Sequence, residues 1–125
     1  MIKKEVTLCG RAVTLAYCYA AEIAYKKLSG DDMLDYAKHA IESIQSERDP
    51  DTERTLYAII ACMMAYYKDE EKFPVKDKDI MDDATPVEFG TAMLTILNMR
   101  SEFYHVPKGE PGEKPERGAR KKKNA

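Results

Sequence analysis

The sequence lacks a hydrophobic run that is long enough to cross a membrane. Its longest mostly apolar stretch without a charge, residues 56–67, has 12 residues, whereas a bilayer-spanning helix needs about 20. A wholly disordered chain is also excluded, because 44% of the 125 residues are hydrophobic and can form a core. We therefore expect one folded domain and no membrane contact.

Cysteine is scarce, and its pattern is not that of a disulfide framework or a zinc knuckle. There are three cysteines, an odd number, and no C-x-x-C pattern: Cys9, Cys18 and Cys62. We expect them to serve as small buried apolar side chains in a reducing cytoplasm. An export signal is disfavoured, since Glu5 and Arg11 interrupt the segment that follows Lys3 and Lys4.

Charge divides the chain into two unlike parts. The formal net charge is -2, from 20 basic and 22 acidic residues, but residues 1–105 hold 13 basic and 19 acidic side chains (-6). Residues 106–125 hold 7 basic and 3 acidic ones (+4), with three prolines and three glycines. The composition predicts a globular domain over residues 1–105 and a disordered charged tail over residues 106–125.

The N-terminal segment has the alternation of a β-hairpin. Apolar side chains recur at every second position on either side of Gly10: Ile2, Val6, Leu8, Val13, Leu15 and Tyr17. Glycine permits the positive φ of a tight turn, so two short strands are predicted. Because a lone hairpin is marginal in water, it must pack on something else.

Helical patterns follow the hairpin. The first runs over residues 19–29, with Ala20, Ala24 and Leu28 at spacing four, and stops at Gly30. Asp31 or Asp32 then caps a second helix whose predicted stripe is Met33, Ala37, Ile41 and Ile44.

The third helix is predicted to be the centre of the core. Asp49 and Pro50 supply a cap and a first-turn proline. Its apolar face is the clearest in the chain: Leu56, Ile59, Ile60, Met63, Met64 and Tyr67.

Residues 69–84 are acidic and predict a loop with one helical turn. Thr85 and Glu88 then form the capping-box pattern that begins a last helix, ending near Tyr104. Its predicted face is Phe89, Ala92, Met93, Ile96, Leu97, Arg100 and Phe103. The fold class is thus α+β and mainly helical: an N-terminal β-hairpin packed on a bundle of about four to five helices.

Catalytic patterns are missing. The two histidines, His39 and His105, are far apart and are interpreted as surface or boundary residues, with His105 suited to the negative end of a helix. No Gly-rich phosphate loop, H-E-x-x-H or G-x-S-x-G occurs. We expect no enzyme and no cofactor.

Two charged runs are candidates for ligand binding. The twelve residues that run from Asp77 to Glu88 have the length of a calcium loop, but Asp82 replaces the turning glycine and Met81 replaces an acidic ligand. We therefore interpret the run Asp77, Asp79, Asp82, Asp83 as a solvated acidic loop and expect no metal. The basic run at residues 120–123 is either a solubilising tail or a contact for nucleic acid or an acidic partner.

Met63, Met64, Tyr66 and Tyr67 are the candidate partner-binding residues. They cover more of a helix circumference than one packing face uses, since neighbouring residues point about 100° apart. They belong to the core or to an adaptable protein-binding surface, for which methionine and tyrosine are well suited.

Residues 5–34 resemble the opening of one protein family. The hairpin segment EVTLCGRAVTL, the aromatic entry to a helix, and the helix end KLSGDD are similar to the tail assembly chaperones of long-tailed bacteriophages and prophages. The likeness in architecture extends over roughly residues 3–105.

The resemblance implies a non-enzymatic protein of the bacterial host cytoplasm. It would bind the tape measure protein, keep the long hydrophobic helices of that protein soluble, and help to recruit tail tube subunits; it is also a possible homo-oligomer. The competing hypothesis is a small regulator that uses the basic C-terminal tail to contact nucleic acid, although the -6 charge of residues 1–105 would repel the phosphate backbone of nucleic acid.

Overall fold

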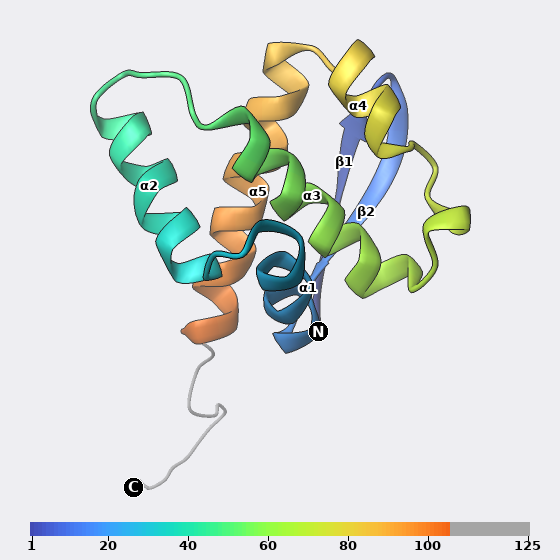
Figure 1. The fold of residues 1–125 in the computed structure, drawn as a ribbon, viewed down its shortest axis with the longest axis horizontal. Coiled ribbons are helices and arrows are strands. Elements are labelled where there is room, and N and C mark those ends of the chain that lie inside the picture. Colours follow the sequence, from blue (N-terminus) through green and yellow to red (C-terminus); the bar gives the residue numbers. More distant parts are fainter. Residues whose placement is uncertain (106–125) are drawn as a thin grey trace, which may run out of the picture.

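The computed structural model describes residues 1–105, and both the predicted disordered tail and the basic run lie outside them. The described part holds one antiparallel β-hairpin and five α-helices, so the predicted fold class is confirmed (Figure 1). In order along the chain, the elements are β1 (Ile2–Leu8), β2 (Arg11–Tyr17), α1 (Tyr19–Ser29), α2 (Met33–Gln45), α3 (Thr52–Tyr67), the 3-10 turn η1 (Glu70–Lys72), α4 (Asp77–Asp83) and α5 (Pro86–Tyr104).

The two strands are joined by the predicted tight turn at Gly10. Leu8 pairs with Arg11, so Cys9 and Gly10 alone connect the strands. Both have positive φ, 54° and 75°, which is the requirement of a type I′ turn and matches the twist of the strands. Alternation then turns Val6 and Leu8 of β1, and Val13, Leu15 and Tyr17 of β2, towards the helices.

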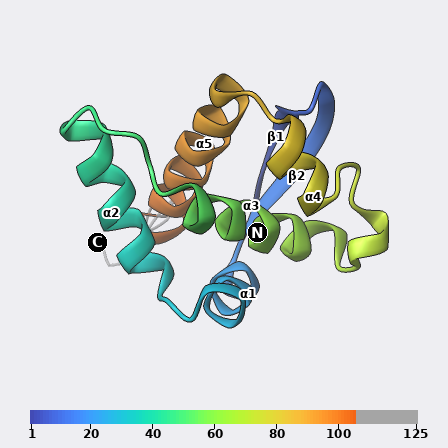
Figure 2. The same ribbon diagram turned by 45° about the horizontal axis from the view of Figure 1, so that its top comes forward.

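Helix α3 is the central core helix, as predicted. In Figures 1 and 2 it crosses the middle of the molecule, with the hairpin and α5 on one side and α1 beneath it. Nine of its residues are buried, among them Ile59, Ile60 and Met63. The predicted cap was wrong, however: Asp51 is the N-cap and accepts from the backbone N–H of Arg54 at 3.0 Å, so Asp49 and Pro50 precede the helix.

The predicted apolar rows of α1 and α2 were only partly correct. On α1 the buried residues are Ala21 and Tyr25, whereas Leu28 is exposed. On α2, Met33 and Ala37 are buried as predicted, but Ile41 and Ile44 are 46% and 44% exposed. Tyr36 is buried in their place, where its hydroxyl lies 3.0 Å from that of Thr55.

The acidic stretch is more ordered than a loop. Residues 77–83 form the two-turn helix α4, which is anchored by the buried Ile80, while Phe73 and Val75 are buried just before it. These three apolar residues hold the segment against the domain, so the predicted loop with one helical turn was only partly correct, because the helical part is longer than one turn. The capping box that starts α5 is confirmed, because Thr85 accepts from the N–H of Glu88 and Glu88 accepts from that of Thr85.

Candidate partner-binding groove

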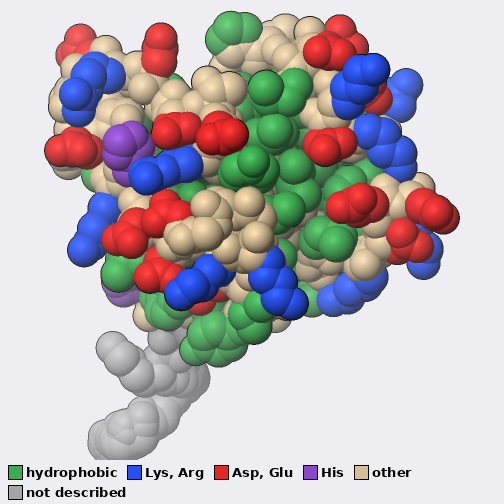
Figure 3. All heavy atoms as spheres, viewed as in Figure 1, with side chains coloured by type: hydrophobic (Ala, Val, Ile, Leu, Met, Phe, Trp, Pro, Cys, Tyr) green, Lys and Arg blue, Asp and Glu red, His purple; other side chains and the backbone are tan. Residues whose placement is uncertain are grey.

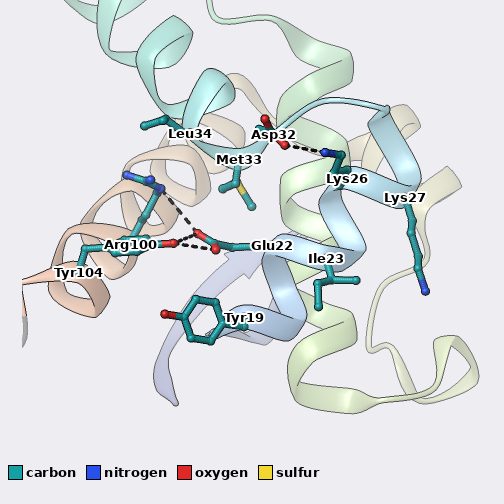
Figure 4. A pocket seen from close by; sticks show the side chains of 10 residues that line it. All are labelled: Tyr19, Glu22, Ile23, Lys26, Lys27, Asp32, Met33, Leu34, Arg100 and Tyr104. Atoms are coloured by element: carbon teal, nitrogen blue, oxygen red, sulfur yellow. Dashed lines mark hydrogen bonds and ion pairs between the residues drawn. The ribbon is translucent and has the colours of Figure 1, made fainter.

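A groove of about 830 Å³ lies between α1, the start of α2 and the end of α5 (Figure 4). Its apolar lining comes from all three helices: Tyr19, Ile23, Met33, Leu34 and Tyr104. Four of these are large and exposed, at 65% for Tyr19, 58% for Ile23, and 47% each for Leu34 and Tyr104. An exposed group of this kind is typical of an interaction site.

The local fold explains why these side chains face solvent. Only Cys18 separates the end of β2 from the start of helix α1, which buries Ala21 and Tyr25. Since 100° separates successive residues, Tyr19 and Ile23 then lie together on an outer side of the helix. The ring of Tyr19 also packs edge-on against Phe103 of α5, with centroids 5.0 Å apart.

The carboxylate of Glu22, which lines the groove, is held by hydrogen bonds and an ion pair. Glu22 accepts hydrogen bonds of 2.7 Å from the hydroxyls of Tyr17 and Tyr104, and the Nε atom of Arg100 lies 3.9 Å from its Oε2 atom. The hydrogen bond to Glu22 raises the pKa of Tyr104, and burial, reinforced by Glu22, raises that of Tyr17. Strand β2 and helices α1 and α5 are joined at this carboxylate.

Arg100 is positioned by stacking as well as by charge. Its guanidinium lies 4.6 Å from the ring centroid of Tyr104, a cation–π geometry. The Nε atom is buried and makes no hydrogen bond within the described residues. Beyond it, Lys26 and Asp32 form an ion pair of 3.1 Å across the rim (Figure 4).

The candidate residues predicted on α3 do not form one surface. Met63 is fully buried in the hydrophobic core, which is the first of the two alternatives for these residues. Met64 and Tyr67 are half-buried, and the Tyr67 hydroxyl accepts from the backbone N–H of Thr14 at 3.0 Å. Tyr66 is 40% exposed, and the Nζ atom of Lys3 lies 5.9 Å from its ring centroid.

Apolar side chains also reach the surface away from the groove. Figure 3 shows them gathered over α3, with charged side chains around them. Among the groups considered for chemistry, His39 and His105 are exposed. The Nδ1 atom of His105 lies 2.7 Å from the carbonyl of Ser101. His105 thus stands at the C-terminal end of α5, the negative end of a helix to which the sequence assigned it.

The three cysteines are free and differ in burial. Cys62 is fully buried, in agreement with its predicted role, and its burial raises the pKa of the thiol. Cys9 and Cys18 are only half-buried. The Sγ atom of Cys9 donates to the carbonyl of Asp79 at 3.3 Å.

The acidic run lies along the short helix α4, with Asp77, Asp79, Asp82 and Asp83 all exposed. Within residues 1–105, no group of three or more His, Cys, Asp or Glu side chains is placed to hold a metal ion. None of the helices in this range has the length and hydrophobicity of a membrane span.

No family model, curated protein or solved structure matches this chain.

The groove residues were not among the sequence-based candidates, although one signal for them was present. Helix α1 carries two apolar rows, Ala20/Ala24 and Tyr19/Ile23, in addition to the row that is buried. A short helix with more apolar rows than one packing face needs must leave at least one of them exposed.

Proposed function

We propose that this protein is a non-enzymatic tail assembly chaperone of a bacteriophage or prophage. It binds the tape measure protein in the cytoplasm of the bacterial host and helps to recruit tail tube subunits. The resemblance of residues 5–34 supports the family, and the groove between α1 and α5 supports the mode of binding.

The exposed apolar groove is the observation that carries this proposal. Amphipathic helices are commonly recognised by grooves that accept apolar residues spaced three and four apart. Tyr19 and Ile23 on one wall and Tyr104 on the other offer such a surface. A tape measure protein, with its long apolar helices, would be kept soluble by covering those helices in this way.

Co-expression tests the proposal directly. We expect a tape measure gene immediately downstream of this one, and we expect its product to be soluble only when the two proteins are made together. Ile23→Asp should abolish the effect by placing a charge in the groove. Val87→Asp is the matched control, since Val87 is 77% exposed and lies at the opposite end of α5 from Tyr104.

Two results would count against the chaperone. One is a tape measure protein that is equally insoluble with and without the wild-type chain. The other is binding of DNA in its place, with an affinity that falls steeply as salt rises, which is typical of phosphate contacts. The second result would favour the regulator hypothesis.

A further inference from the structure

The groove is lined by one row of side chains from α1 and one from α5. On α1, Tyr19, Ile23 and Lys27 follow one another at spacing four, and on α5 Arg100 and Tyr104 do the same. Figure 4 shows Met33 and Leu34 at the start of α2, on the side of the groove where Arg100 lies. Eight residues of helix rise about 12 Å, so the α1 row offers about two turns of contact.

The charge of the lining differs in sign from that of the whole domain. Three cations, Lys26, Lys27 and Arg100, and two carboxylates, Glu22 and Asp32, line the groove. The groove therefore has a net charge of +1 on a domain of charge -6. An acidic ligand would be repelled by most of this surface but not at the groove.

The carboxylates in the groove are already engaged. Glu22 accepts from Tyr17 and Tyr104 and faces Arg100, and Asp32 is paired with Lys26. Neither is available for a cation on a partner without loss of an existing contact.

One of the cations that line the groove is free to pair with a carboxylate of a partner. Lys27 has no carboxylate partner among the ion pairs of residues 1–105. The Nε atom of Arg100 is buried and faces Glu22 at 3.9 Å, so it is not open to a partner. The groove thus offers the Lys27 ammonium and an apolar surface together.

We propose that the groove selects an amphipathic helix of another protein that carries an acidic side chain beside its apolar anchors. Apolar residues at i and i+4 pack against Tyr19 and Ile23, and a glutamate or aspartate about one turn further along reaches Lys27, the next residue of the same row. This inference rests on the proposed function for the assumption that the occupant is a partner helix. The chain's own residues 106–125, with a charge of +4, have the wrong sign to occupy it.

The test uses the full chain and three synthetic helical peptides of about 18 residues, long enough to form a helix when bound. All three have leucines at i, i+4 and i+8, and they differ only in a flanking residue, which is glutamate, glutamine or lysine. Fluorescence anisotropy at low salt gives each Kd. We expect the glutamate peptide to bind about 1.5-fold to fivefold more tightly than the glutamine peptide, the range of one exposed ion pair.

Variants of the protein locate the effect. Lys27→Glu should reverse the order of the peptides, so that the lysine peptide binds best. Lys78→Glu on α4 makes the same change in net charge far from the groove and should keep the wild-type order. Ile23→Asp should weaken all three peptides at least tenfold, provided that its circular dichroism spectrum matches that of the wild type.

Several outcomes would overturn the inference. Equal affinity for the three peptides removes the acidic requirement, while soluble co-expression of the tape measure protein would still support the chaperone. Unchanged binding by Ile23→Asp places the site elsewhere. If no peptide binds and sedimentation shows a dimer that Ile23→Asp dissociates, the groove is an interface between two copies of this chain.

Discussion

The carboxylate of Glu88 accepts a hydrogen bond from the backbone N–H of Gly10, at 3.0 Å, across 78 residues of sequence. It also accepts from the N–H of Cys9 at 3.0 Å and from that of Thr85 at 3.1 Å. One side chain thus completes the N-terminal cap of α5 and binds the turn of the hairpin. The hairpin turn and the first turn of the last helix are joined at this residue.

This double role predicts an unequal effect of two cap substitutions. Thr85→Ala removes one acceptor from the cap and should lower the free energy of unfolding by about 1 kcal/mol. Glu88→Ala removes the other half of the capping box together with the bonds to Cys9 and Gly10, so its effect should be larger. Urea unfolding followed by circular dichroism measures both. Glu102→Ala, which removes only an exposed ion pair with Lys4, is the control; equal losses in the two cap variants would contradict the role in the turn.

The same hydrogen bonds predict a dependence of stability on pH. Backbone N–H groups of Thr85, Gly10 and Cys9 lower the pKa of Glu88 below its ordinary value of 4.5. Because the folded pKa is depressed, the stabilisation is present above about pH 4.5 and is lost as the pH falls below it. The difference in urea midpoint between the wild type and Glu88→Gln should therefore be greatest near neutral pH and shrink in acid. A difference that stays constant down to pH 3 would refute it.

The fold was predictable where local signals and tertiary packing agree. The alternation around Gly10 and the capping box at Thr85 each act within a few residues, and both are present in the structure. The central position of α3 followed from its wide apolar face. The exposure of Ile41 and Ile44 was not predictable, because the spacing of apolar residues does not tell how far a neighbouring element extends along α2.

The candidate site was less predictable than the fold. Met63 and Tyr66 are three residues apart, and both are residue types that suit a protein-binding surface. Met63 is nevertheless fully buried, whereas Tyr66 is 40% exposed. Which of them faces the hairpin depends on the rotation of α3 about its axis, which only long-range packing sets. The groove joins Tyr19 to Tyr104, from opposite ends of the domain sequence, and no local pattern links them.

Burial on α3 predicts opposite outcomes for two substitutions on the same helix. Ile60 is 5% exposed, so Ile60→Asp buries an unpaired charge and should cost several kcal/mol, against a typical total stability of about 5–15 kcal/mol. Tyr66→Ser, at the exposed site, should cost less than about 1 kcal/mol. Thermal unfolding and the soluble yield measure both effects. A folded, soluble Ile60→Asp protein would show that α3 is not the core helix.

Tyr17 predicts a loss of stability in alkali. It is fully buried, and burial, together with its hydrogen bond to Glu22, raises its pKa above the ordinary value of 10. A raised folded pKa gives stabilisation that is complete below pH 10 and is lost as the pH rises above it, since only the unfolded chain then releases the proton readily. Titration of this hydroxyl therefore destabilises the fold in alkali.

Tyr17→Phe removes that proton and tests the effect. At neutral pH the substitution should lower the free energy of unfolding by about 1–3 kcal/mol, because the hydrogen bond to a charged acceptor is lost. Between about pH 9 and pH 11 the urea midpoint of the variant should fall less steeply than that of the wild type. Tyr104 and Arg100 still hold Glu22 in this variant, so the groove should keep its shape. If the plots of urea midpoint against pH were parallel for the two proteins, the Tyr17 hydroxyl would have the same pKa in the folded and unfolded chains. That result would contradict the burial of this hydroxyl and its hydrogen bond to Glu22.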